Sequence, residues 1–215
     1  MQGEWNVVEV RTNFCILQTM ITINDVLNHY WDTVGNEQDT FKIRGDNHFS
    51  KLNDFLNDKI HAKGIPESFI SCAYRNRKSW DMHFPDINVA IEYKTFTAKG
   101  ISGNKNNRIE EALGSSIDLK TKHPHYKLGF IAVFAFRENS MPVVKAREIV
   151  IEVFDRMIGD GHYDMFLPIQ TMGINNHFEL SEKYSLDTFI ESINYNTQQK
   201  NGSLSMKSNL NNFFV

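Results

Sequence analysis

The chain has 215 residues, of which 41% are hydrophobic, and it carries 16 phenylalanines and a net charge of -3. Its aromatic content excludes a disordered chain, and a chain of this length can bury about 70% of its unfolded surface in one core. Cys15 and Cys72 lack the spacing of a disulfide framework or a zinc site, and no run reaches the roughly 18 apolar residues of a membrane-spanning helix, so we expect a cytoplasmic protein with no membrane partner.

The first predicted elements are a helix and three strands. Apolar residues recur at helical spacing from Leu52 to Ile60, after a candidate cap at Ser50 and before Gly64, which suits a left-handed helix end. Residues 67–73 form a short apolar run typical of a strand. Residues 80–84 and 89–95 follow a similar pattern on either side of a Pro-Asp turn, so together they predict a hairpin.

The second half of the chain alternates helices with strands. A helix is predicted from about Asn107, with Glu110 in the capping-box position. Residues 128–136 are a continuous apolar run, typical of a strand buried on both faces. A helix over 145–158, a strand over 165–170 and a helix over 186–193 complete an α/β sandwich, a central mixed β-sheet flanked by helices. We expect a single domain over residues 1–193, followed at 194–215 by a polar linker and a short C-terminal tail.

The charges are distributed unevenly. Residues 1–60 carry 5 basic and 9 acidic side chains, whereas residues 75–127 carry 10 basic and 6 acidic ones. The middle of the chain is therefore the segment suited to face a polyanion such as nucleic acid. A solvated surface with an excess of lysine would have the same composition.

Glu92 and Lys94 are two residues apart in a predicted strand, so their side chains point to the same face. Such a pair is common, and an exposed salt bridge worth under about 1 kcal/mol would explain it equally well. A catalytic site for phosphate chemistry needs a second acid. Asp46, Asp54 and Asp58 are candidates for a further contribution.

The second acid is identified by the geometry of the hairpin. Asp86 lies six residues from Glu92, roughly 20 Å along an extended strand, which is too far for two ligands of one ion. If residues 85–88 form the reversal, Asp81 lies directly opposite Glu92, with β-carbons about 4.5–5.5 Å apart. Two opposed carboxylates repel each other unless a cation lies between them.

Hard oxygen ligands of this kind favour Mg²⁺, for which Mn²⁺ can substitute. In this hypothesis Asp81 and Glu92 bind the metal, and Lys94 orients the attacking water or stabilises charge that develops on a phosphate. Hydrolysis would leave a 5′-phosphate and a 3′-hydroxyl. The spacing leaves open whether one or two metal ions take part.

Four stretches of the sequence resemble the XhoI-like type II restriction endonucleases, from about residue 43 to 170. They are Ile43-Arg-Gly-Asp-Asn-His48, Tyr74-Arg-Asn-Arg-Lys-Ser-Trp-Asp81, Val89-Ala-Ile-Glu-Tyr-Lys-Thr95 and Gly103-Asn-Lys-Asn-Asn-Arg-Ile-Glu-Glu-Ala-Leu-Gly114, with Asp118 after the last. The resemblance implies a restriction-endonuclease-like fold of the PD-(D/E)XK superfamily. It also implies that Asp81, rather than Asp86, is the metal-binding aspartate.

The chain departs from the family pattern at three places: a short Phe-Pro-Asp-Ile turn, Lys105 where an aromatic residue is common, and Thr95 where serine is usual. None of these removes a catalytic group. Because of Lys105 and of the termini, which do not match the family, the DNA sequence that the family recognises is not carried over to this chain.

Six residues are predicted to contact DNA. Asparagine amides can pair with adenine, and arginine with guanine or phosphate, while a helix N-terminus favours phosphate. Alternatively, Asn107 only caps its helix, Arg108 only pairs with Glu111 or Glu110, and the basic residues before Asp81 only aid solubility. The six candidates are Asn104, Asn106, Asn107, Arg108, Arg75 and Lys78.

The functional hypothesis is therefore a Mg²⁺-dependent type II restriction endonuclease that cuts double-stranded DNA at a specific site. A palindromic target cut on both strands predicts a homodimer, and a restriction enzyme predicts a cognate DNA methyltransferase as a separate protein. Two alternatives are a repair or phage-defence nuclease of the same fold with low specificity and a catalytically silent DNA-binding module.

Overall fold

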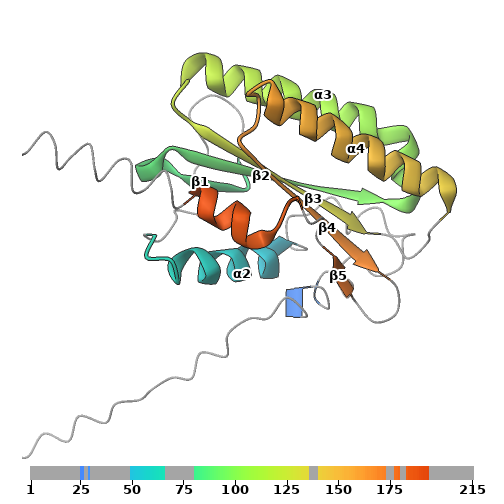
Figure 1. Ribbon diagram of the computed structural model, residues 1–215, viewed down its shortest axis with the longest axis horizontal. Coiled ribbons are helices and arrows are strands. Elements are labelled where there is room, and N and C mark those ends of the chain that lie inside the picture. Colours follow the sequence, from blue (N-terminus) through green and yellow to red (C-terminus); the bar gives the residue numbers. More distant parts are fainter. Residues whose placement is uncertain are drawn as a thin grey trace, which may run out of the picture.

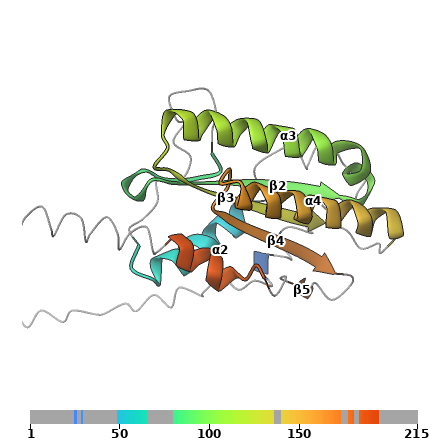
Figure 2. The same ribbon diagram turned by 45° about the horizontal axis from the view of Figure 1, so that its top comes forward.

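The computed structural model describes residues 25–26, 29, 49–65, 80–135, 140–172, 177–179 and 183–193. In this part of the chain a five-stranded sheet lies between two layers of helices (Figure 1). The helices α3 (Ala98–Lys122) and α4 (Met141–Gly159) pack on one face, and α2 (Ser50–His61) packs on the other with the helix of residues 186–193 (Figure 2). The predicted α/β sandwich is thereby confirmed.

The strands follow one another across the sheet in chain order. The outer pairs, β1–β2 and β4–β5, are antiparallel, and the inner pairs, β2–β3 and β3–β4, are parallel, which confirms a mixed sheet. Each parallel step needs a crossover, supplied by α3 and α4. Because such crossovers are almost always right-handed, two steps in the same direction bring both helices to the same face. The five strands are β1 (Met82–Phe84), β2 (Val89–Thr97), β3 (Lys127–Ala135), β4 (Met165–Met172) and β5 (His177–Glu179).

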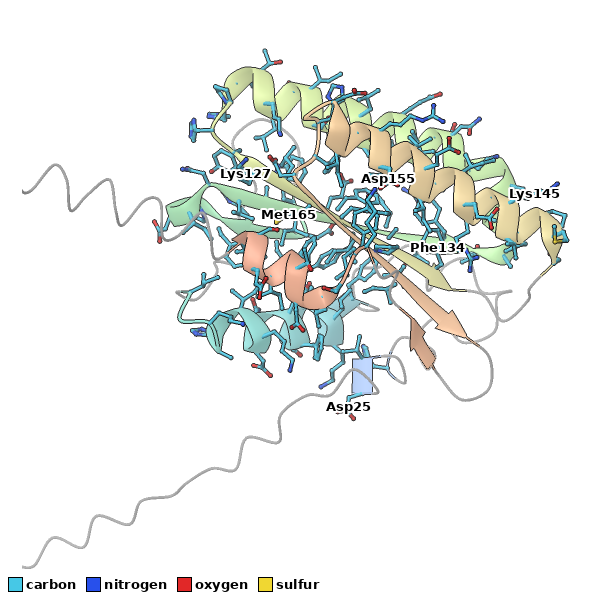
Figure 3. All side chains as sticks on the ribbon, in the orientation of Figure 1. Asp25, Lys127, Phe134, Lys145, Asp155 and Met165 are labelled. Atoms are coloured by element: carbon cyan, nitrogen blue, oxygen red, sulfur yellow. The ribbon has the colours of Figure 1, made fainter. Side chains whose placement is uncertain are left out.

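The central strand β3 is buried on both faces, as its apolar sequence predicts. Leu128 to Phe134 are all buried, and Figure 3 labels Lys127 and Phe134 near the two ends of the strand. Gly129 is needed for close packing, because a β-carbon there would come within 2.9 Å of the Phe189 ring. The helix of residues 186–193 can therefore pack closely on this face of the sheet.

The helix α2 confirms the predicted element and corrects its start. Leu52, Phe55, Leu56 and Ile60 form its buried face, as predicted. The N-cap position belongs to Phe49, whose side chain makes no capping bond, and the Ser50 hydroxyl is hydrogen-bonded to His29 at 3.0 Å. At the other end Gly64 has the left-handed conformation that the sequence predicts, with φ of 75°.

The start of α3 differs from the prediction. The helix begins at Ala98 rather than near Asn107, and the Thr97 side chain caps it by accepting a hydrogen bond from the Gly100 amide at 3.2 Å. Glycines and asparagines at 100–107 have low helix propensity and are typical of a loop. A cap directly after a strand and the burial of Ile101 override that propensity. The predicted capping box at Asn107 and Glu110 is therefore wrong.

Other predictions lie outside the described residues: the strand at 67–73, the linker and tail at 194–215, both cysteines, Asp46, Arg75 and Lys78. Among the described residues, no helix combines the length and the apolar character that crossing a membrane requires.

Candidate active site

The candidate site is built on the β1–β2 hairpin. Three residues of β1 pair with three of β2, Met82 with Ile91, His83 with Ala90 and Phe84 with Val89. The reversal is a turn of 3-10 helix over Pro85–Ile87, followed by Asn88 in the left-handed region with φ of 54°. This register is the one predicted from the sequence. Continued by one residue, it sets Asp81 opposite Glu92.

Asp81 is anchored to the neighbouring strand by its carboxylate. Its Oδ2 accepts a hydrogen bond from the backbone amide of Tyr93 at 2.6 Å. A carboxylate has about four acceptor positions, so the bond from the Tyr93 amide orients the side chain and does not by itself prevent it from binding a cation. Asp86, in contrast, lies exposed in the reversal.

Glu92 and Lys94 form an ion pair on the face of the sheet that α3 and α4 cover. The Lys94 Nζ lies 2.9 Å from Glu92 Oε1, and the side chains are 24% and 2% exposed, respectively. A buried carboxylate is costly unless it is paired, so Lys94 compensates for the burial of Glu92. Because the Lys94 side chain remains partly exposed, the pair is accessible to solvent from the lysine side.

Tyr93 points to the opposite face, as alternation along the strand requires. Its ring lies 5.3 Å from that of Phe49, and both residues belong to the core. Burial raises the pKa of the Tyr93 phenol well above its usual range, and the charge of Asp81 raises it further. Tyr93 therefore stays neutral, and its main contribution to the site is its backbone amide.

Sequence reasoning missed Tyr163, which lies next to Glu92. Its hydroxyl donates to the backbone carbonyl of Ala112 in α3 at 3.0 Å. Burial raises the pKa of this phenol well above its usual range, and the charge of Glu92 and a hydrogen bond with its carboxylate raise it further. The crossover from β3 through α4 brings Tyr163 here, and no local motif around Tyr163 indicates this position.

The donor set is compatible with Mg²⁺. Mg²⁺ is commonly bound by one or two carboxylates together with waters and substrate phosphates, and Asp81 and Glu92 are two such carboxylates. Among the described residues, no group of three or more His, Cys, Asp or Glu side chains is gathered as a metal site. Asp54 and Asp58, exposed on α2, are therefore not brought together with the pair as a third ligand.

The candidate DNA contacts lie in the first half of α3 rather than at its beginning. Asn104, Asn106 and Asn107 are exposed, whereas Arg108 is 42% exposed and pairs with Glu111 at 3.2 Å. The sequence analysis predicted a helix N-terminus near Asn107 that would favour phosphate. This prediction is wrong, because the helix begins at Ala98 and Asn107 lies in its interior. Arg75 and Lys78 fall outside the described part of the chain.

Residues three or four apart on a helix share a face, but residues two apart do not. Asn104, Asn107 and Arg108 therefore form one polar face, and Asn106 lies on another side of α3. An exposed ion pair such as Arg108–Glu111 is worth at most about 1 kcal/mol, so it does not keep the guanidinium from a stronger partner.

In the comparison with known proteins, no protein-family model, no curated protein and no solved structure matches the chain. The assignment of a function therefore depends on the geometry of the hairpin and on the sequence pattern.

Proposed function

We propose that the protein is a Mg²⁺-dependent DNA endonuclease of the PD-(D/E)XK type, with Asp81, Glu92 and Lys94 as its catalytic residues. The observation that carries the proposal is the hairpin register, which brings an aspartate opposite a glutamate with a lysine two residues farther along. That register is set by Met82, His83 and Phe84 and their partners. The chemistry of a two-carboxylate metal site requires the same register, so two independent lines of reasoning lead to it.

The burial of the charged groups also supports a catalytic role. An ordinary surface salt bridge would leave both partners exposed, whereas Glu92 is 2% exposed. Replacing a buried ion pair by apolar residues often leaves the stability of a protein unchanged or increases it. A contribution to stability therefore does not explain why the chain buries Glu92 next to Lys94. A site that must hold a cation next to a phosphate does require these charges.

Each residue has a defined task in the proposed reaction. Asp81 and Glu92 would hold the cation, and a bound Mg²⁺ supplies Lewis-acid polarisation of the scissile phosphate. Lys94, partly exposed beside Glu92, orients the attacking water and stabilises negative charge on the phosphate. The water oxygen loses a proton to solvent and forms a bond to phosphorus, while the bond from phosphorus to the 3′ oxygen breaks and that oxygen takes up a proton from solvent. The products are a 5′-phosphate and a 3′-hydroxyl.

The polar face of α3 is the proposed DNA-reading surface. Asn104 and Asn107 can each pair with the edge of an adenine, and Arg108 with guanine or a phosphate. The helix α3 directly follows β2, the strand that carries Glu92 and Lys94. The proposed recognition surface and the proposed catalytic residues would thus lie on consecutive elements of the chain.

The resemblance to XhoI-like enzymes favours site-specific cutting and a restriction-endonuclease-like fold. A palindromic site cut on both strands requires two related active sites, so we propose a homodimer. We also propose a separate DNA methyltransferase as the cognate partner. Sedimentation of the full chain with and without DNA would measure the number of copies in the complex.

Cleavage of supercoiled plasmid DNA tests the proposal. With Mg²⁺ we expect discrete fragments whose ends can be ligated without added phosphate, because the 5′-phosphate is retained. With EDTA, or with Glu92→Gln in Mg²⁺, we expect intact plasmid.

The same assay distinguishes the alternatives. Nicks and smears in Mg²⁺ would favour a repair or defence nuclease of low specificity. A gel shift in Ca²⁺ without cleavage in Mg²⁺ or Mn²⁺ would favour a DNA-binding module with a silent site. If there is neither cleavage nor binding, the proposed function is wrong.

A further inference from the structure

The strand β1 directly follows Asp81, and the sheet alone holds it weakly. It is three residues long and lies at an edge of the described sheet, where it pairs with β2. Short edge strands open more readily than central strands, because few backbone hydrogen bonds hold them. The position of Asp81 therefore depends on the other contacts that β1 makes.

A buried hydrogen bond joins β1 to the start of β3. The Nε2 atom of His83 lies 2.9 Å from the hydroxyl of Tyr126, and the histidine tautomer decides which of the two donates. The two rings also stack, with centroids 5.7 Å apart and an interplanar angle of 22°. His83 is 4% exposed and Tyr126 is 6% exposed, so water competes little for this hydrogen bond.

The tyrosine end of this contact is fixed by the loop between α3 and β3. The Tyr126 amide donates to the His123 carbonyl at 3.0 Å, and the rings of these two residues pack edge-on with centroids 5.8 Å apart. The amide of the next residue, Lys127, donates at 2.8 Å to the carbonyl of Asn88, which ends the hairpin reversal. Tyr126 is therefore a fixed point to which β1 is attached.

The contact lies on the face of the sheet that holds the proposed catalytic residues. His83 pairs with Ala90, which belongs with Tyr126 to the core cluster under α3 and α4. Side chains two apart in a strand share a face, and Glu92 and Lys94 follow Ala90 at this spacing. The hydrogen bond and the proposed metal site therefore lie along the same face of the hairpin.

We propose that Tyr126 is a positioning residue, whose hydrogen bond to His83 ties β1 to the loop between α3 and β3 and thereby fixes the Asp81 carboxylate opposite Glu92. The role of Asp81 as a metal ligand in this inference rests on the proposed function. A displacement of about 1 Å at a catalytic group can slow a reaction about 100-fold, even when its cause is remote. Tyr126 acts through the strand and has no direct part in the chemistry.

Exchange of the Tyr93 backbone amide with solvent reports the position of Asp81, because this amide donates to the Asp81 carboxylate. Tyr126→Phe removes only the hydroxyl and keeps the stacked ring. In the full-length protein without metal, we expect the Tyr93 amide to exchange about fivefold faster or more in this variant, as measured by NMR. The increase should exceed that of the Val133 amide in the central strand β3, which reports any loss of global stability.

Two further comparisons separate positioning from a general loss of stability. His83→Gln keeps an amide that can bond to the Tyr126 hydroxyl, so Tyr93 exchange should stay within about twofold of the parent, whereas His83→Leu should match Tyr126→Phe. Ser116→Ala is the matched control, because it removes another buried hydroxyl, which donates to the Leu113 carbonyl within α3 at 2.8 Å. This control should leave the exchange of the Tyr93 amide unchanged.

Cleavage kinetics connect the contact with the proposed reaction. In Mg²⁺ we expect Tyr126→Phe to lower kcat on plasmid DNA by about tenfold, with KM and the Ca²⁺-supported affinity for DNA within about twofold of the parent. Ser116→Ala should keep all three quantities at the parent values.

The exchange and cleavage measurements distinguish a failure of this inference from a failure of the proposed function. If Tyr126→Phe raises Tyr93 exchange no more than Ser116→Ala does, the inference is overturned even if the parent protein cuts DNA. If exchange rises as expected but the parent neither cuts nor binds DNA, the positioning of Asp81 is supported and only the proposed function is wrong. Fast exchange with an unchanged kcat, in a protein that cuts DNA, would overturn the role of Tyr126 in catalysis.

Discussion

The β1–β2 hairpin and the helix α3 are adjacent in the chain, yet their sequences specify structure in different ways. In the hairpin, the register that pairs Met82 with Ile91 follows from a compact reversal and from side-chain alternation. In α3, the polar stretch before Asn107 has the composition of a loop but is helical from Ala98. The hairpin is thus specified locally, whereas the start of the helix depends on the preceding strand and on core packing.

The two regions also differ in where they place charge. The hairpin buries Glu92 and pairs it with Lys94, whereas α3 leaves its asparagines exposed to solvent. Buried charges suit chemistry that requires fixed geometry, and exposed amides suit contacts that form only when a ligand arrives. We therefore expect changes in the hairpin to act on the rate of cleavage and changes in α3 to act on DNA affinity.

The largest effect is expected from Glu92→Gln. It keeps the shape of the side chain but removes the charge that would hold the cation, so kcat should fall by about 10³-fold, equivalent to several kcal/mol of transition-state stabilisation. Affinity for DNA in Ca²⁺, measured by gel shift, should change little. Circular dichroism would show that the variant is folded. If Glu92→Gln weakened DNA binding as much as it slowed cleavage, the hairpin and α3 would not have the separate tasks expected of them.

The next effect compares two aspartates in the same hairpin. Asp81→Asn should lower kcat by about 10²–10³-fold through loss of charge, while its amide oxygen can still accept the Tyr93 hydrogen bond. Asp86→Asn makes the same chemical change in the exposed reversal and should leave kcat within about twofold, because surface changes of this kind have small effects. Single-turnover cleavage measures both. Greater damage from Asp86→Asn would contradict the proposed site.

A smaller effect is expected on α3. Asn107→Ala should weaken binding to the cognate DNA by about 1–3 kcal/mol, the contribution of one bidentate contact to a base. Asn106→Ala removes the same amide from another side of the helix and should cost less than about 0.5 kcal/mol. Fluorescence anisotropy in Ca²⁺ with the cleaved sequence measures both affinities. Equal losses would mean that DNA does not contact the face formed by Asn104, Asn107 and Arg108.

The difference between the β1–β2 hairpin and the start of α3 explains which parts of the structure could be predicted from the sequence. The buried strand β3 and the helix α4 follow from apolar periodicity, because burial of apolar side chains drives folding most strongly and the pattern reports that burial directly. Asp81 and Glu92 could be paired because the hairpin leaves few alternatives. The position of Tyr163 beside Glu92 could not be predicted, since it results from a crossover whose packing depends on the whole of α3 and α4. The sequence did not predict the strand β5, which is formed by three residues.

The boundary between the two regions gives the smallest and most local prediction. Thr97→Ala removes the cap of α3, which should lower the free energy of unfolding by about 1 kcal/mol, and Thr97→Ser, which keeps the hydroxyl, should restore most of it. Urea titration measures both. If α3 began near Asn107, Thr97→Ala would leave stability unchanged, and Asn107→Ala would carry the capping cost instead. Because Thr97 lies outside both the hairpin contacts and the asparagine face, its loss should reduce stability while kcat and DNA affinity stay within about twofold of the parent.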